Sequence, residues 1–310
     1  MPRKLRLEYE DAIYHLMSRG DRREDIFLED GDRRLFLQTL GETCKKTDWR
    51  VHAYCLMRNH FHLVVETPKA NLCAGMRWFL GTYTTRFNRR HKLFGHLFSG
   101  RYKSLVVDGS EGGYLKTVCD YVHLNPVRAK LLAPEQPLKS YPWSSYREYL
   151  KRPNQRLGWL RVGRLLGEWR IRQDNPAGRR QFEQGMEERK AQEQRLESED
   201  WKALRRGWCF GQKSFRSQLL ELIGQNQTEH HYGEEVRESA VEKAERLTKQ
   251  LLEKARWTEA DLEKHRKGQE VKVRMAGRLR AETTATWKWI ATRLKMGHWR
   301  SAANAVAASR

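Results

Sequence analysis

The fold of this chain is constrained most by residues 58–66, which read RNHFHLVVE. Side chains alternate between the two faces of a strand. His60 and His62 are therefore expected on one face, while Phe61 and Leu63 point into a core from the other. The stretch predicts a strand that is buried on one face and carries two neighbouring imidazoles on the other. Taken alone, the pair fits either a metal site or two sheet-face histidines without a ligand.

Patterns on both sides of this stretch predict the rest of an α+β domain. Alternating runs predict strands, and apolar residues at helical spacing predict helices. The strands fall at residues 12–17, 49–56, 60–66 and 102–107, and the helices at 31–46, 71–88 and 110–124. The turn at 57–59 would join the second and third strands into a hairpin. The order strand, helix, strand, strand, helix, strand is that of the ferredoxin-like, or split βαβ, fold with an antiparallel sheet.

The middle of the chain, residues 151–275, is predicted to be a charged helical region. Within it, residues 179–204 suit a solvated helix, and residues 234–256 carry apolar side chains at helical spacing. Thr258 and Asp261 fit a capping box at the start of the following helix.

The last segment, residues 276–310, predicts a helix-turn-helix. Trp287 and Leu294 recur at helical spacing, Met296-Gly297 makes a turn, and Ser301 is placed to cap a second short helix. Such a module reads duplex DNA. The same pattern equally fits two helices that merely pack together. The predicted division of the chain is therefore residues 1–150, 151–275 and 276–310.

The chain is strongly basic, which indicates a polyanionic partner. Its 310 residues carry a formal net charge of +21, and 32% of them are charged. Such an excess is most often the footprint of a nucleic acid and less often of an anionic membrane surface. No apolar run approaches the roughly 18 to 20 residues of a membrane span, and the N-terminus lacks the apolar core of a signal peptide. We therefore expect a cytoplasmic, nucleoid-associated protein without membrane contact.

The positive charge is unevenly distributed, because residues 69–107 contain no Asp or Glu. Basic residues in this stretch are interleaved with aromatic ones. They are Lys69, Arg77, Arg86, Arg89, Arg90, Lys92, Arg101 and Lys103, with Trp78, Tyr83, Phe87, Phe94, Phe98 and Tyr102 between them. Basic side chains track a phosphate backbone and exposed rings stack on bases, a combination that suits single-stranded DNA. Several of these aromatic residues must instead belong to the core.

A second chemical constellation lies in residues 121–129, YVHLNPVRA. On a helix, Tyr121 and Asn125 share a face, so a phenol would lie beside an amide oxygen. Pro126 disfavours a helical conformation at Asn125 and places that residue at the helix end. Tyr121 also fits a simple core tyrosine. Tyr114, seven residues earlier on the same face, is a rival for any role given to Tyr121.

Together these motifs resemble the single-tyrosine transposases of the HUH endonuclease superfamily. The shared motifs are His60-x-His62, the run GRYKS at 100–104, and Tyr121-x-x-x-Asn125 followed by PVRA. The N-terminal run YHLMSRG at 14–20 also fits. Within the superfamily, the chain is most similar to the REP-associated tyrosine transposases, relatives of the IS200-type enzymes. The resemblance covers about residues 8–150, and residues 200–211 also resemble longer members of the group.

The resemblance implies roles for individual residues. His60 and His62 match the pair that holds a divalent metal, Mg²⁺ or Mn²⁺, and Tyr121 matches the nucleophile. Asn125 matches a third ligand, although that position is typically glutamine in IS200-type enzymes. Arg19, Arg101 and Lys103 fall in family motifs and are implied DNA contacts. From the charge pattern we expect further contacts at Arg77, Arg86, Arg89 and Arg90.

The resulting hypothesis is a metal-dependent, site-specific single-strand DNA endonuclease and strand transferase. Tyr121 would become joined to a 5′ phosphate and free a 3′ hydroxyl. The expected partners are single-stranded or hairpin DNA, with duplex DNA at the C-terminal segment, bound by a monomer or a homodimer. One alternative is a non-catalytic DNA-binding regulator derived from such a transposase. Another is a metal-dependent hydrolase that uses water in place of Tyr121.

Overall fold

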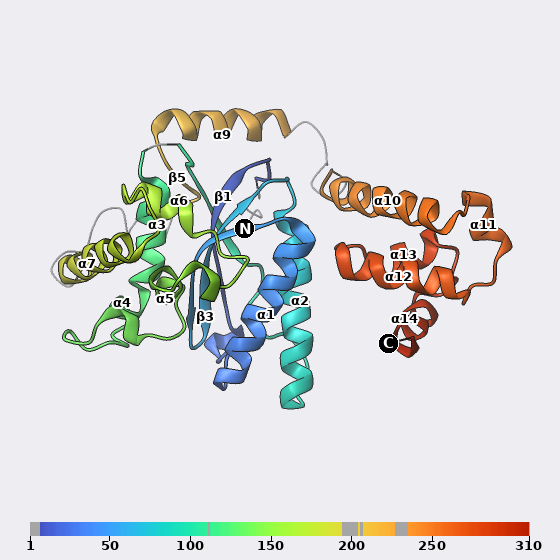
Figure 1. The fold of residues 1–310 in the computed structure, drawn as a ribbon, viewed down its shortest axis with the longest axis horizontal. Coiled ribbons are helices and arrows are strands. Elements are labelled where there is room, and N and C mark those ends of the chain that lie inside the picture. Colours follow the sequence, from blue (N-terminus) through green and yellow to red (C-terminus); the bar gives the residue numbers. More distant parts are fainter. Residues whose placement is uncertain (1–6, 111, 194–203, 205–206, 227–234, 310) are drawn as a thin grey trace.

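The computed structural model describes residues 7–110, 112–193, 204, 207–226 and 235–309. A five-stranded sheet forms the centre of its N-terminal part (Figure 1). The strands are β1 (Ala12–Arg19), β2 (Arg50–Met57), β3 (His60–Thr67), β4 (Lys103–Val107) and β5 (Cys209–Phe210). Their order across the sheet is β2-β3-β1-β4-β5, with antiparallel neighbours except for the parallel pair β4 and β5. The first four strands have the predicted ferredoxin-like order.

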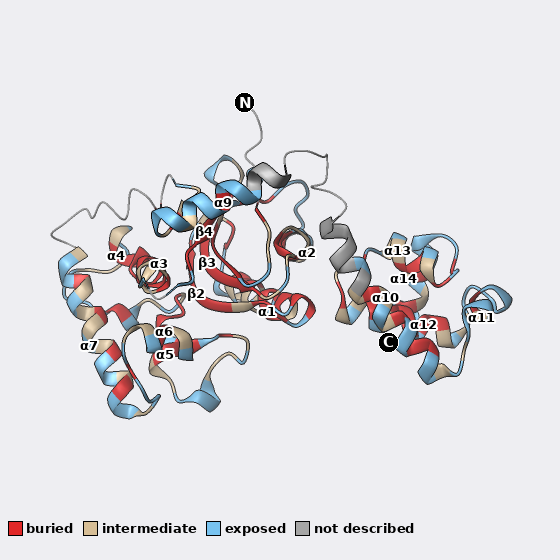
Figure 2. Ribbon diagram, turned by 90° about the horizontal axis from the view of Figure 1, so that it is seen from above, coloured by how far each residue is buried: buried red, intermediate tan, exposed pale blue. Residues whose placement is uncertain are grey.

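Two long helices, α1 (Asp30–Thr47) and α2 (Leu72–His91), cover one face of the sheet. The ring of Phe36 on α1 lies 5.0 Å from that of Phe61 on β3 and 4.8 Å from that of Phe79 on α2. Figure 2 shows buried residues concentrated in the sheet and on the helix sides that face it. Phe61 therefore points into this core, which sends His60 and His62 to the opposite face.

The opposite face carries α3 (Tyr114–His123), α4 (Asn125–Arg128) and α6 (Val162–Glu168). The helix predicted at 110–124 begins later, because Gly113 has a φ of +72° and interrupts helical geometry. It ends at His123, and Pro126 lies in the first turn of α4. A helix boundary therefore lies just before Pro126, as predicted, but Asn125 is itself helical, as the first residue of α4.

Residues beyond 150 extend the same core. They form η3 (Pro153–Gln155) and the longer helices α7 (Pro176–Glu193) and α9 (Lys213–Asn226). The short elements η1 (Asp21–Arg23), η2 (Leu138–Ser140) and α5 (Tyr146–Leu150) come before residue 151. The expectation of a solvated helix is wrong for α7, because its Phe182 is fully buried and stacks on Tyr149 at 5.1 Å. The rest of the stretch predicted at 179–204 lies outside the described residues, except for Leu204.

A second core lies in the C-terminal part. Its helices are α10 (Glu235–Ala255), α11 (Glu259–Lys264), α12 (Glu270–Glu282), α13 (Trp287–Arg293) and α14 (Trp299–Ala308). The predicted capping box of Thr258 and Asp261 is present. The predicted helix, turn and helix are present as α13, a turn at Gly297 and α14, although α14 is capped by His298 and not by Ser301.

The packing joins residues on both sides of the predicted boundaries. The first core includes side chains from Leu7 to Leu219, and the second includes side chains from Ala244 to Val306. The division into functional regions at residues 150 and 275 stays a prediction. No helix in the described parts of the chain combines the length and the apolar character needed to span a membrane.

Candidate active site

A cavity of about 370 Å³ lies on the sheet face that α3 and α4 cover. The sheet supplies His15, Arg19, His60, His62 and Lys103 to its lining, and the helices supply Tyr121, Asn125 and Arg128. Strand register explains the first group, because Arg19 pairs with His60 and Met17 pairs with His62 across β1 and β3. Directly paired residues of antiparallel strands share one face. The fold therefore brings the two histidines, Tyr121 and Asn125 together, although they come from three elements.

The hydrogen bonds of Asn59 fix the orientation of the His60 ring. The side-chain nitrogen of Asn59 donates to the Arg23 carbonyl at 3.0 Å, so its oxygen is the atom that lies 2.8 Å from His60 Nδ1. That oxygen can only accept, so His60 Nδ1 carries the hydrogen and Nε2 keeps its lone pair. Burial, with a smaller effect of Arg19, lowers the pKa of His60 to about 4. The imidazole is therefore neutral near pH 7.

His62 is held by a third histidine, His15. Nε2 of His15 lies 2.9 Å from Nδ1 of His62, and the two rings stack with centroids 5.2 Å apart. Burial lowers the pKa of His15 to about 4 and that of His62 well below its usual value. Both rings are therefore neutral, and one donates its hydrogen to the other. When His62 Nδ1 donates, the Nε2 of His62 has a free lone pair.

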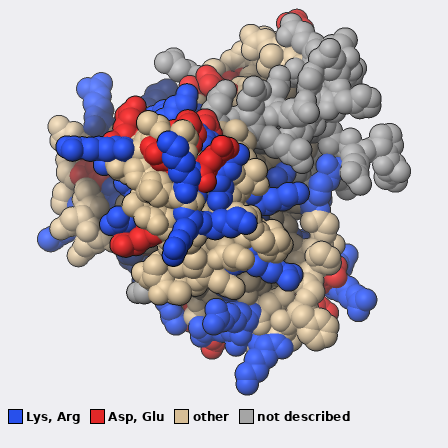
Figure 3. Space-filling view, turned by 90° about the vertical axis from the view of Figure 1, so that its right-hand side faces the viewer, with Lys and Arg blue, Asp and Glu red and all other residues tan. Residues whose placement is uncertain are grey.

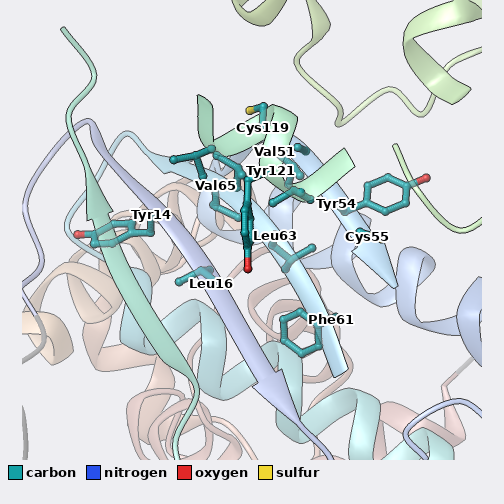
Figure 4. Close-up of a cluster of buried hydrophobic side chains, with 14 of the residues drawn as sticks. Tyr14, Leu16, Val51, Tyr54, Cys55, Phe61, Leu63, Val65, Cys119 and Tyr121 are labelled. Atoms are coloured by element: carbon teal, nitrogen blue, oxygen red, sulfur yellow. The ribbon is translucent and has the colours of Figure 1, made fainter. Parts of the chain in front are cut away.

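Tyr121 reaches from α3 over the sheet (Figure 4). Its ring centroid lies 5.6 Å from that of His15 and 6.0 Å from that of His62. The guanidinium of Arg128 lies 3.8 Å from the Tyr121 ring centroid and also donates to the Tyr121 carbonyl. Arg128 is in turn paired with Glu193 at the end of α7, at 2.9 Å. The basic group beside Tyr121 is thus fixed by a helix 65 residues away in sequence.

Tyr114, the rival of Tyr121, lies elsewhere. It begins α3, is not part of the cavity lining, and packs edge-on against Phe210 with ring centroids 5.2 Å apart. Two helical turns separate the two tyrosines, a rise of about 10 Å along the axis.

Asn125 lies at the junction of α3 and α4, buried in the cavity wall. Its amide nitrogen faces the Val122 carbonyl at 3.4 Å. The side-chain oxygen is therefore the atom that remains for a cation.

The basic residues expected to contact DNA divide into two groups. Arg19 and Lys103 line the cavity, and Arg101 is exposed just before β4. The other four are on α2, on the opposite side of the sheet: Arg77, Arg86, Arg89 and Arg90. Two of these are paired with acidic groups, because Arg86 bonds Glu42 through two nitrogens and Arg90 bonds Glu29.

A different acidic and histidine cluster, Glu29, Asp32 and His91, lies at the start of α1. One Asp32 oxygen accepts the backbone N–H groups of Leu28 and Glu29, at 2.9 and 3.1 Å, and Arg90 bonds Glu29. Glu29 and Asp32 therefore cap the start of α1, and the Arg90 guanidinium is the cation that pairs with Glu29.

Three residues of the site were missed as functional positions by sequence reasoning. His15 shares the alternation of the first predicted strand, Asn59 precedes the histidine pair, and Arg128 belongs to the PVRA run. Each lies inside or beside a recognised motif. For two of them the partner comes from a different element: His15 contacts His62 of β3, and Arg128 forms an ion pair with Glu193 of α7.

Part of this chain is similar to a known protein family. Residues 8–125 match the family model described as IS200-like transposase, a stretch that contains His60, His62, Tyr121 and Asn125. This part of the chain is therefore similar to the IS200-like transposases, a family of DNA-processing enzymes. Among solved structures, one match is a REP-associated tyrosine transposase bound to a REP hairpin. It is 13% identical, with a TM-score of 0.41, and the match covers 51% of this chain and 92% of the other. No curated protein matches the chain.

Proposed function

We propose that this protein cleaves and rejoins single-stranded DNA through a covalent bond between Tyr121 and a 5′ phosphate. The observation that carries the proposal is the meeting of Tyr121 with His60 and His62 in one cavity, where both imidazoles are neutral. A general nuclease that used water would need no tyrosine at this point.

The donor set fits a divalent cation, Mg²⁺ or Mn²⁺. His60 Nε2 has a free lone pair because Nδ1 donates to Asn59, and His62 has one when its Nδ1 donates to His15. The Asn125 oxygen is the proposed third ligand. When bound, the cation supplies a Lewis acid that polarises the scissile phosphate and stabilises its developing charge.

The chain's own residues would perform the transfer as follows. The Tyr121 oxygen loses its proton, forms a bond to phosphorus and breaks the bond from phosphorus to the 3′ oxygen, which leaves as a protonated 3′ hydroxyl. Arg128 holds a positive charge over the Tyr121 ring, and Arg19 and Lys103 add positive charge at the cavity wall. Attack of a 3′ hydroxyl on the phosphotyrosine reverses the step and rejoins a strand, because the bond energy has been conserved.

The proposed substrate is single-stranded DNA beside a hairpin. Basic groups at the cavity wall suit a phosphate backbone, and Phe94 is 97% exposed in the loop that leads to β4. A free aromatic ring can stack on an unpaired base. Duplex binding by α13 and α14, and action as a monomer or a homodimer, stay predictions.

Adduct formation tests the proposal directly. The full-length protein is incubated with Mn²⁺ and a labelled hairpin oligonucleotide with single-stranded flanks, and the products are run on a denaturing gel. We expect a covalent adduct with the natural chain and with Tyr114→Phe, and none with Tyr121→Phe, which should still bind the oligonucleotide. An adduct that persists in Tyr121→Phe and disappears in Tyr114→Phe would refute the assignment.

Two other outcomes would select the alternatives. Cleavage without an adduct, retained in Tyr121→Phe, indicates a hydrolase that uses water. Binding without cleavage in the natural chain indicates a DNA-binding regulator.

Removal of the metal provides an independent check. A chelator should abolish the adduct, and added Mn²⁺ should restore it. We expect His60→Ala and His62→Ala to lose the adduct and Mn²⁺ binding measured by calorimetry, while most of the phosphate-driven DNA affinity is retained. Normal Mn²⁺ binding by both variants would exclude the histidine pair as the metal site.

A further inference from the structure

A second and larger hollow, of about 1060 Å³, lies between α2 and the C-terminal helices. On one side it is lined by Arg77 and Trp78 of α2, and on the other by Arg280, Lys288 and Trp289. Because α2 covers the sheet face opposite the histidines, this interdomain groove is separated from the Tyr121 cavity by the sheet (Figure 1).

The two walls of the interdomain groove are held in place by Lys46. Its ammonium group donates to the carbonyls of Arg280 and Ala281 near the end of α12, at 2.7 and 2.5 Å. A cation at the carbonyl end of a helix satisfies groups that have no partner within the helix. The same ammonium lies 4.8 Å from the Trp78 ring centroid, and Lys243 donates to the Lys46 carbonyl at 2.5 Å. These contacts therefore link the α2 wall of the groove to its α12 wall.

The charge of the interdomain groove is entirely positive, since its lining contains basic side chains and no Asp or Glu. Arg86 is paired with Glu42, and Arg280 donates to the Ala285 carbonyl. Arg77 and Lys288 are exposed, one on each wall, and neither is paired with an acidic group among the residues that the structure describes. Lys and Arg also spread over the outer face of the C-terminal helices (Figure 3).

The rest of the lining is aromatic and hydroxylic. Trp78 and Trp289 are half-buried, so part of each ring is accessible, and threonines such as Thr82 and Thr292 add hydroxyl groups. Basic groups beside accessible aromatic rings are the elements of a single-strand binding path, where phosphates meet cations and unpaired bases stack. A duplex keeps its bases stacked inside and would leave the rings without a partner.

We propose that the interdomain groove binds single-stranded DNA, with phosphates at Arg77 and Lys288 and a base stacked on Trp289. The C-terminal helices would thereby hold a strand on the side of the sheet away from Tyr121. This binding does not depend on cleavage, so it can be tested independently of the chemistry proposed for Tyr121.

Salt-dependent binding of an unstructured oligonucleotide tests the phosphate contacts. Binding of a fluorescent 20-residue oligo-dT to the full-length chain is measured by anisotropy over a range of salt concentrations. Loss of two phosphate contacts in the double variant Arg77→Gln, Lys288→Gln should reduce the slope of log K against log salt by about 1.4. The matched control Arg34→Gln, Lys264→Gln removes two exposed cations outside the groove and should leave the slope unchanged.

Stacking is tested at the tryptophan. Trp289→Ala should weaken oligo-dT binding about 5-fold or more, while Trp289→Phe, which keeps a ring, should retain most of the affinity. Thermal unfolding shows whether either tryptophan variant has lost the C-terminal fold. If one has, the salt dependence of the double variant Arg77→Gln, Lys288→Gln decides the question. Equal slopes for the groove and control variants would overturn the proposal. So would losses confined to a 20-base-pair duplex, which would make the groove a duplex site.

Discussion

Nε2 of His15 lies 2.9 Å from Nδ1 of His62, and both rings are neutral and buried. One imidazole thus orients another that is itself a proposed metal ligand. Such an outer partner fixes the tautomer and ring angle of the ligand, and its loss typically costs 10- to 100-fold in metal affinity.

For His15 we expect a change in metal affinity with little change in fold. His15→Leu should weaken Mn²⁺ binding by about 10- to 100-fold in calorimetry, because His62 loses the acceptor that directs its Nε2 outward. His15→Gln keeps an acceptor and should bind more tightly than His15→Leu. Equal Mn²⁺ affinity in the natural chain and His15→Leu would show that the contact does not orient the ligand.

Asn59 is predicted to act in the same way on His60. Asn59→Ala removes the oxygen that accepts from His60 Nδ1, so the ring can rotate or change tautomer. We expect Mn²⁺ affinity to fall by about 10-fold or more. Asn59→Asp preserves an acceptor for His60 Nδ1 and should recover most of the Mn²⁺ affinity. If its Mn²⁺ affinity is as low as that of Asn59→Ala, the loss is due to the missing bond from Asn59 to the Arg23 carbonyl.

Arg128 is predicted to affect the rate of adduct formation. Arg128→Lys keeps the charge but lacks the planar group that lies over the Tyr121 ring and bonds its carbonyl. We expect the rate of adduct formation to fall about 10-fold or more, since a small misplacement of a reacting group is costly. Oligonucleotide binding should change much less. An unchanged rate, in a variant with normal thermal stability, would limit Arg128 to packing.

The stability of the protein should fall in mild acid, in part because of His123. Burial lowers the pKa of His123 to about 3, whereas an unfolded histidine has a pKa near 6.5. Below pH 6.5 the unfolded chain therefore binds a proton that the folded chain does not. From pH 7 to pH 5 this group alone should reduce the free energy of unfolding by about 2 kcal/mol.

Denaturant unfolding of His123→Gln at both pH values measures that contribution. The loss of stability on acidification should be smaller in the variant than in the natural chain by about the same 2 kcal/mol. An equal loss in both proteins would mean that His123 is protonated in the folded state.

Phe94 should contribute to DNA binding and not to stability. Its side chain is 97% exposed, so Phe94→Ala should change the free energy of unfolding by less than about 0.5 kcal/mol. Loss of one stacked base should weaken binding of the flanked hairpin about 5-fold or more. Leu220→Ala, which removes another exposed apolar side chain on α9, is the control and should bind normally. Normal binding by Phe94→Ala would exclude the ring from the DNA path.

Much of the fold and the centre of the site could be predicted from local pattern. Period-two alternation determined that His60 and His62 share a face, and helical spacing placed Tyr121 and Asn125 one turn apart. Local pattern failed where packing decides. The charged helix α7 was expected in solvent, yet Phe182 and Met186 are buried, because the apolar stripe is short and interrupted by charged residues.

The sequence by itself determined the order of the first four strands and the helices between them, and the residues proposed to carry the chemistry, because these depend on neighbours one to four positions apart. Only the tertiary structure decided what surrounds them. His15 contacts His62 because β1 pairs with β3, and Glu193 of α7 forms an ion pair with Arg128. Lys46 of α1 donates to a carbonyl near the end of α12. Such contacts link residues tens to hundreds of positions apart, and no local periodicity records which distant side chain will fill a given place in a packed core.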